Sequence, residues 1–165
     1  MFNKVFVALA MLGAASVYAV DVPLVGTVDS KCVVTTDTVG VYGNPLPYRL
    51  STAQADGGVE PIVRYDVIQA DYYKALISFP ESFSESPALD DVVSWTGTVQ
   101  VAEVTDALMS DYDNTKIQYD NVTEVDLSVA GSTWFKVTSQ ADYGFNKALP
   151  AGTYRAIVQA ECIAQ

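Results

Sequence analysis

The segment WTGTVQVAEV, residues 95–104, decides the fold class because its side chains alternate with a period of two. One set of positions is mostly apolar and the other mostly polar: Trp95, Gly97, Val99, Val101 and Glu103 against Thr96, Thr98, Gln100 and Ala102. Successive side chains of a β-strand point to opposite faces, so this segment is predicted to be a half-buried strand.

The same alternation recurs on both sides of this segment. Upstream, Pro61–Gln69 places Val63, Tyr65 and Val67 on one face. All these segments are rich in the β-branched and aromatic residues that favour strands. With residues 95–104, the expected strands are Thr27–Thr36, Pro61–Gln69, Tyr72–Phe79, Lys116–Tyr119, Val122–Val129, Trp134–Thr138 and Ala151–Ala164.

Turn-forming residues separate the expected strands. Gly40–Pro47 carries two prolines and is excluded from a central strand, because proline cannot donate a ladder hydrogen bond. The other expected turns and loops are Gln54–Gly58, Pro80–Asp91, an acidic stretch at Asp106–Asn114 with one helical turn at Ala107–Met109, Ala130–Ser132, and Ala141–Leu149. About eight short antiparallel strands with this spacing predict an all-β sandwich or barrel.

The N-terminus resembles a secretory signal peptide. Lys4 gives it a positive start, Val5–Ala15 is apolar or small, and Val17-Tyr18-Ala19 ends in the small residues that a signal peptidase needs. We therefore expect residues 1–19 to be removed, leaving a single domain at 20–165. A membrane anchor, a buried helix or cleavage after Ala15 are the alternatives.

The charge balance excludes some classes of partner. The chain has 9 Lys+Arg and 20 Asp+Glu, a net charge of −11. Loss of Lys4 with the signal peptide leaves 8 − 20 = −12. Such an acidic surface repels phosphates, so we expect no nucleic acid partner and no membrane insertion after cleavage. The expected location is the periplasm or the cell surface.

Two cysteines, Cys32 and Cys162, stand near the two ends of the mature chain. In an oxidising compartment an isolated pair indicates a disulfide. Two free thiols are the alternative. A zinc site is disfavoured because the chain has no histidine to complete a typical ligand set.

Catalytic and metal motifs are sparse. Because the chain has no histidine, Ser-His-Asp and Cys-His mechanisms are excluded. The remaining candidates for catalytic groups are pairs of carboxylates such as Asp90–Asp91. We therefore predict a protein that is not an enzyme and needs no cofactor. Oxygen-rich side chains suit calcium, so the acidic loop with Asp106, Asp111 and Asp113 is a calcium candidate. A solvated acidic turn is the alternative.

Two stretches resemble a known family. Gly26–Val34 reads GTVDSKCVV, and Leu149–Val158 reads LPAGTYRAIV. They are similar to the first and closing strands of chaperone–usher pilins and of spore-coat-protein-U-like secreted domains. The resemblance implies an immunoglobulin-like sandwich. This chain differs from those pilins in one respect. Their first-strand cysteine usually pairs with a cysteine some tens of residues further along the chain, whereas here the partner of Cys32 is Cys162.

The resemblance implies that subunits assemble by inserting a strand of one copy into a groove of the next. The mature N-terminus suits this role, because its alternate positions are apolar or glycine: Val20, Val22, Leu24, Gly26 and Val28. An ordinary first strand of the same domain is the alternative. The closing strand would form a groove edge, with Gly152, Tyr154 and Ile157 as candidates.

The leading hypothesis is therefore a structural subunit of an extracellular filament or surface coat. It self-associates through edge strands, and the resemblance implies an assembly chaperone in the periplasm. The alternative is a monomeric secreted module that binds a glycan or a protein with its tyrosine-bearing loops, where Tyr42 and Tyr48 are expected to be exposed.

Overall fold

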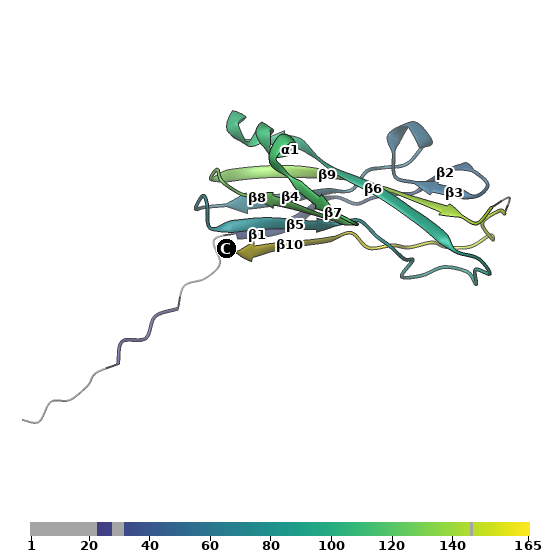
Figure 1. Ribbon diagram of the computed structural model, residues 1–165, viewed down its shortest axis with the longest axis horizontal. Coiled ribbons are helices and arrows are strands. Elements are labelled where there is room, and N and C mark those ends of the chain that lie inside the picture. The colour runs from purple at the N-terminus through teal and green to yellow at the C-terminus, as the bar shows by residue number, and fades with distance from the viewer. Residues whose placement is uncertain (1–22, 28–31, 146) are drawn as a thin grey trace, which may run out of the picture.

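The computed structural model describes residues 23–27, 32–145 and 147–165. Within them the chain forms ten strands, all paired antiparallel, in two sheets, which confirms the predicted all-β sandwich (Figure 1). The strands are β1 (Cys32–Thr38), β2 (Gly43–Leu46), β3 (Arg49–Ser51), β4 (Ile62–Val67), β5 (Tyr73–Ser78), β6 (Val93–Val104), β7 (Ile117–Tyr119), β8 (Val122–Asp126), β9 (Gly131–Tyr143) and β10 (Gln159–Ala164). The predicted signal peptide, residues 1–19, lies outside the described residues.

The first sheet is organised around β9. One side of β9 pairs with β6 along its length, and the other side pairs with β4 and then with β3. β1 lies outside β4, and β2 lies outside β3. β2 contains Pro45 and sits at a sheet edge, as expected for a proline-bearing segment.

The second sheet has the strand order β10-β5-β8-β7. The core between the two sheets comes from the alternate positions that the sequence marked: Val63, Tyr65, Val67, Ala75, Ile77, Val99, Val125 and Leu127 are all buried. Tyr65 and Phe135 meet edge to face at the centre, with ring centroids 5.6 Å apart.

A 3₁₀-helix, η2 (Ala107–Asp111), and α1 (Tyr112–Thr115) follow β6. The predicted helical turn is therefore present, and it is longer than expected. It buries Met109 and Tyr112 in the core, and the Tyr112 hydroxyl accepts a hydrogen bond from the backbone N–H of Val129. A second 3₁₀-helix, η1 (Gln54–Asp56), joins β3 to β4.

The prediction for β9 was wrong at both ends. Residues 130–132 were expected to turn and residues 141–149 to form a loop, but one strand of 13 residues runs from Gly131 to Tyr143. Its inward face includes the polar residues Thr133 and Ser139, which are buried. Partners from other segments satisfy them, since Ser139 bonds the Tyr42 hydroxyl and Thr52.

A β-bulge alters the prediction for β6. The register shifts between Val101 and Glu103, so Ala102 is the extra residue. The bulge turns Glu103 to solvent and Val104 toward the core, whereas uninterrupted alternation had placed Glu103 on the inner face.

Gly97 lies where β6 passes close to the Phe79 ring and to the backbone of β9. A Cβ at this position would stand 2.5 Å from the Phe79 ring and 2.6 Å from the Thr138 carbonyl oxygen. We expect Gly97→Ala to lower the free energy of unfolding by roughly 1–3 kcal/mol, as overpacking does. Urea denaturation measures this, with Gly26→Ala as control because no atom lies within 4 Å of that site. Equal stability of the two variants would contradict the tight contact.

Candidate functional site

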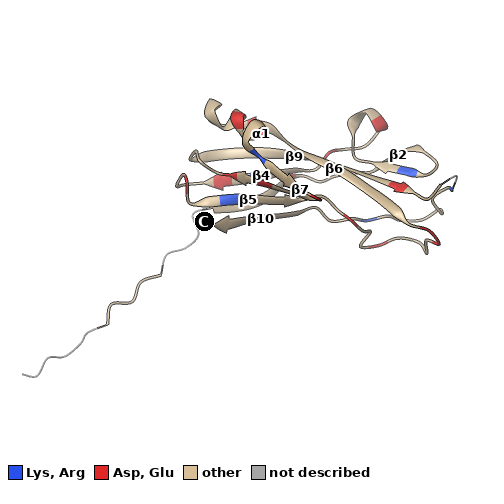
Figure 2. Ribbon diagram, viewed as in Figure 1, with Lys and Arg blue, Asp and Glu red and all other residues tan. Residues whose placement is uncertain are grey.

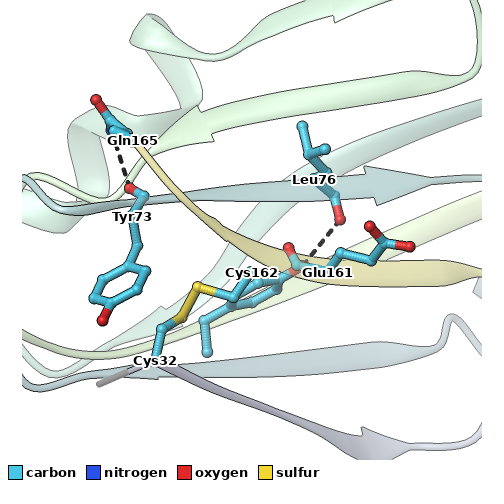
Figure 3. The surroundings of a disulfide bond; sticks show 7 residues. Cys32, Tyr73, Leu76, Glu161, Cys162 and Gln165 are labelled. Carbon is cyan, nitrogen blue, oxygen red and sulfur yellow. Dashed lines mark hydrogen bonds between the residues drawn. A yellow bond between two sulfur atoms is a disulfide. The ribbon is translucent and has the colours of Figure 1, made fainter. Parts of the chain in front are cut away.

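The edges of the two sheets meet at β1 and β10. β1 is an edge strand of the first sheet, and β10 is an edge strand of the second. The predicted disulfide between Cys32 and Cys162 is confirmed, and it joins these two strands with their Cα atoms 6.3 Å apart (Figure 3). The disulfide therefore links the first residue of β1 to the fourth of the six residues of β10.

Beyond the disulfide, a groove of about 440 Å³ lies between β1 and the residues that lead into β10. One wall runs from Val34 to Gly40, and the other from Ala156 to Ala160. No described residue that lines the groove is charged, although the chain has 29 charged residues (9 + 20). The groove is therefore an uncharged cleft in an acidic protein, lined by apolar side chains together with hydroxyl groups of Thr, Ser and Tyr.

The wall at residues 156–158 has no strand beside it. In the described part of the chain, no backbone hydrogen bond joins Ala156, Ile157 or Val158 to another residue. The cause is the partner strand: the ladder between β10 and β5 ends at the pair Gln159–Ser78, and Pro80 follows. The free N–H and C=O groups of these residues form an edge that another strand can pair with.

The inward side chains of β1, which forms the opposite wall, become more exposed along the strand. On β1, the inward positions are Cys32, which is buried, Val34, which is half-buried, and Thr36, which is exposed. In a closed sandwich such alternate positions are covered by the facing sheet. The facing sheet thus covers β1 less and less from the disulfide toward Thr36.

Tyr42 lines the floor of the groove. Its ring is half-buried, and its hydroxyl lies 3.0 Å from the Ser139 hydroxyl. Burial raises the pKa of Tyr42, so the phenol is neutral at physiological pH. The expectation that Tyr42 and Tyr48 are exposed was wrong, because both are half-buried.

The prediction for the closing strand was partly wrong. The strand spans Gln159–Ala164 instead of beginning at residue 151. Gly152 is exposed, and Tyr154 packs on Phe83 with ring centroids 5.1 Å apart. Neither lines the groove. Of the three edge candidates only Ile157 does, and its side chain is 61% exposed.

The candidate insertion segment is partly described. Val20, Val22 and Val28 lie outside the described residues. Leu24 and Val25 are 96% and 93% exposed, and no atom lies within 4 Å of a Cβ placed on Gly26. Residues 23–27 form no strand, so for them the alternative of an ordinary first strand of the same domain is wrong.

The acidic candidates are not brought together. Asp106 caps η2 through the Leu108 N–H, Asp111 accepts from Asn114, and Asp113 binds the Val101 N–H and Lys116. Among the described residues, no group of three or more His, Cys, Asp or Glu side chains could hold a metal ion. Each carboxylate has a local structural contact instead.

Charge elsewhere is scattered. Figure 2 shows acidic and basic positions at both ends of the sandwich. The Asp90–Asp91 pair is bound by Lys147, whose ammonium lies 3.0 Å from Asp90 and 3.3 Å from Asp91. Hydrogen bonds from Tyr143 and Lys147 lower the pKa of Asp90. A carboxyl with a lowered pKa is unsuited to act as a general acid near neutral pH.

The fold and the groove define a disulfide-linked β-sandwich with an open edge. No helix in the described residues is long and apolar enough to cross a membrane. Comparisons with protein-family models, curated proteins and solved structures returned no match.

Proposed function

We propose that this protein is a structural subunit of an extracellular filament or surface coat. In the assembly, the N-terminal arm of one copy, residues 20–28, lies as a strand in the groove of the next. The observation that carries the proposal is the uncharged groove, one wall of which has free backbone groups at residues 156–158.

The arm and the groove are chemically matched. A strand in the groove gains backbone hydrogen bonds from the free edge, and apolar side chains at alternate positions cover the core. The sequence of the arm supplies such side chains at Val20, Val22 and Leu24. Leu24 is almost fully exposed in the single chain, so its burial in a second copy would remove apolar surface from water.

The arm and the groove also match in length. From Val34 to Gly40, an extended chain spans about 20 Å. The eight residues from Val20 to Thr27 span about 23 Å when extended. An arm as short as this one is therefore sufficient for this groove.

An unfilled groove favours unwanted association, because exposed apolar clefts and free strand edges promote aggregation. This supports the proposed role of a periplasmic chaperone that covers the groove before assembly. Export through the predicted signal peptide would bring the chain to that compartment.

Deleting residues 20–27 from the mature protein is the direct test. We expect the wild-type mature chain to form a ladder of multimers on a denaturing gel without boiling, because an inserted strand leaves slowly. Boiling should collapse the ladder to monomer. The deletion variant should run as monomer in both lanes while its far-UV circular dichroism stays unchanged.

Two point variants separate the groove from general surface effects. Ile157→Asp introduces a charge into the groove wall and should reduce multimers at least about tenfold, since burying an unpaired charge is costly. The matched control is Ile68→Asp, at a 74% exposed position that does not line the groove, and it should leave the ladder intact. Wild-type monomer in both lanes would contradict the proposal and favour a secreted binding module.

A further inference from the structure

The end of the groove at the disulfide is closed. The Cα atoms of Cys32 and Cys162 are 6.3 Å apart. Neighbouring strands lie about 4.8 Å apart, so a strand inserted between two others requires about 9.6 Å between them. No strand can therefore lie between β1 and β10 at the level of the disulfide.

A second link holds the same end. The Tyr65 hydroxyl, from β4 of the first sheet, donates to the carbonyl oxygens of Leu76 and Glu161 in the second sheet, at 3.1 and 3.2 Å. Glu161 directly precedes Cys162, and Tyr65 pairs with Val34 of β1. The disulfide and this hydrogen bond both fix β10 against the first sheet. Among the residues that the structure describes, no hydrogen bond or disulfide joins the two groove walls from Thr36 onward.

The arm of the same chain begins at this closed end, because it leads directly into Cys32. To enter its own groove it would have to reverse direction within residues 28–31 and pass around the disulfide. These four residues span at most about 14 Å when fully extended. A tight hairpin would bring its returning strand beside Cys32, where the Cα atom of Cys162 already lies 6.3 Å away.

We propose that the Cys32–Cys162 disulfide prevents the chain from filling its own groove and so directs the arm to a second copy. This inference rests on the proposed function. The occupant of the groove is the arm of another subunit, which reaches the groove beyond the closed end. The disulfide thus selects between self-filling and assembly, in addition to its effect on stability.

The test lengthens the arm and keeps the disulfide. Ten Gly and Ser residues are inserted between Lys31 and Cys32 of the mature chain. A tethered arm has an effective concentration near the millimolar range, so at micromolar protein it should outcompete arms of other copies. We expect the multimer fraction, measured on unboiled gels and by size-exclusion chromatography, to fall at least about tenfold. The same ten residues appended after Gln165 serve as the control and should leave the ladder unchanged.

Cross-linking identifies which chain fills the groove. Leu24 is replaced by p-benzoylphenylalanine in an equal mixture of ¹⁴N- and ¹⁵N-labelled chains, and cross-linked peptides are identified by mass spectrometry. We expect arm-to-groove links between chains in the protein without the insertion, and within one chain after the insertion. Links within single chains before the insertion would overturn this inference and leave arm–groove pairing intact. No arm-to-groove link of either kind would overturn the proposed function, and this inference with it.

Discussion

Replacing both cysteines, Cys32→Ser with Cys162→Ser, will lower the free energy of unfolding by about 4–5 kcal/mol. The disulfide closes a loop with a sequence separation of 130, close to the whole mature chain. In the loop-entropy description, a cross-link over so long a loop removes much of the conformational freedom of the unfolded chain. For a domain of this size, the melting temperature should fall by roughly 10–20 °C.

Urea denaturation of the wild type with and without a phosphine reductant checks this value. Reduced wild type should match the double variant, and the reductant should not change the stability of the variant itself. A loss below about 1 kcal/mol would mean that the unfolded chain without the disulfide retains structure that keeps its two ends close.

Phe135→Ala is the second substitution with a large expected effect. Phe135 is 1% exposed in the middle of β9, edge to face with Tyr65 and stacked on Tyr112 at a centroid distance of 6.5 Å. It therefore connects the central strand, its neighbour β4 and the helical turn after β6. Truncation to alanine loses the free energy gained by burying the ring and leaves a cavity. We therefore expect the free energy of unfolding to fall by about 3–5 kcal/mol.

Phe145→Ala is the matched control for this prediction. Phe145 is 84% exposed in the loop after β9, and its removal should change stability by less than about 0.5 kcal/mol. Thermal melting of both variants gives the comparison. If Phe135→Ala cost no more than Phe145→Ala, the core would have to collapse around the missing ring, and the central role of Phe135 would be wrong.

Strands buried on one face could be predicted well because the alternation of apolar and polar side chains is a property of the local sequence. In β4, Val63, Tyr65 and Val67 alternate with polar residues, and burial follows that alternation. Cys32 and Cys162 could be paired because no other cysteine competes. These features depend on side-chain period and residue count, which need no knowledge of distant neighbours.

The extent of β9 could not be predicted in the same way. Ser139 is a polar residue on the inner face, and Tyr42 and Thr52, far away in the chain, satisfy it there. The bulge at Ala102 likewise depends on the register with β9. Such features arise from partners brought together by folding, so local pattern carries no signal for them.

By itself, the sequence predicted an all-β sandwich or barrel and favoured a disulfide between its ends, because alternation and two lone cysteines are properties of the chain. It also marked the apolar arm before Cys32. Only the tertiary structure shows the groove in which we propose that the arm of another copy binds. The groove exists because β5 ends before Pro80 and leaves residues 156–158 unpaired, while the disulfide holds β1 and β10 together at one end only. An opening between two sheets depends on where each strand ends, and the ends are set by pairing with strands that are distant in the sequence.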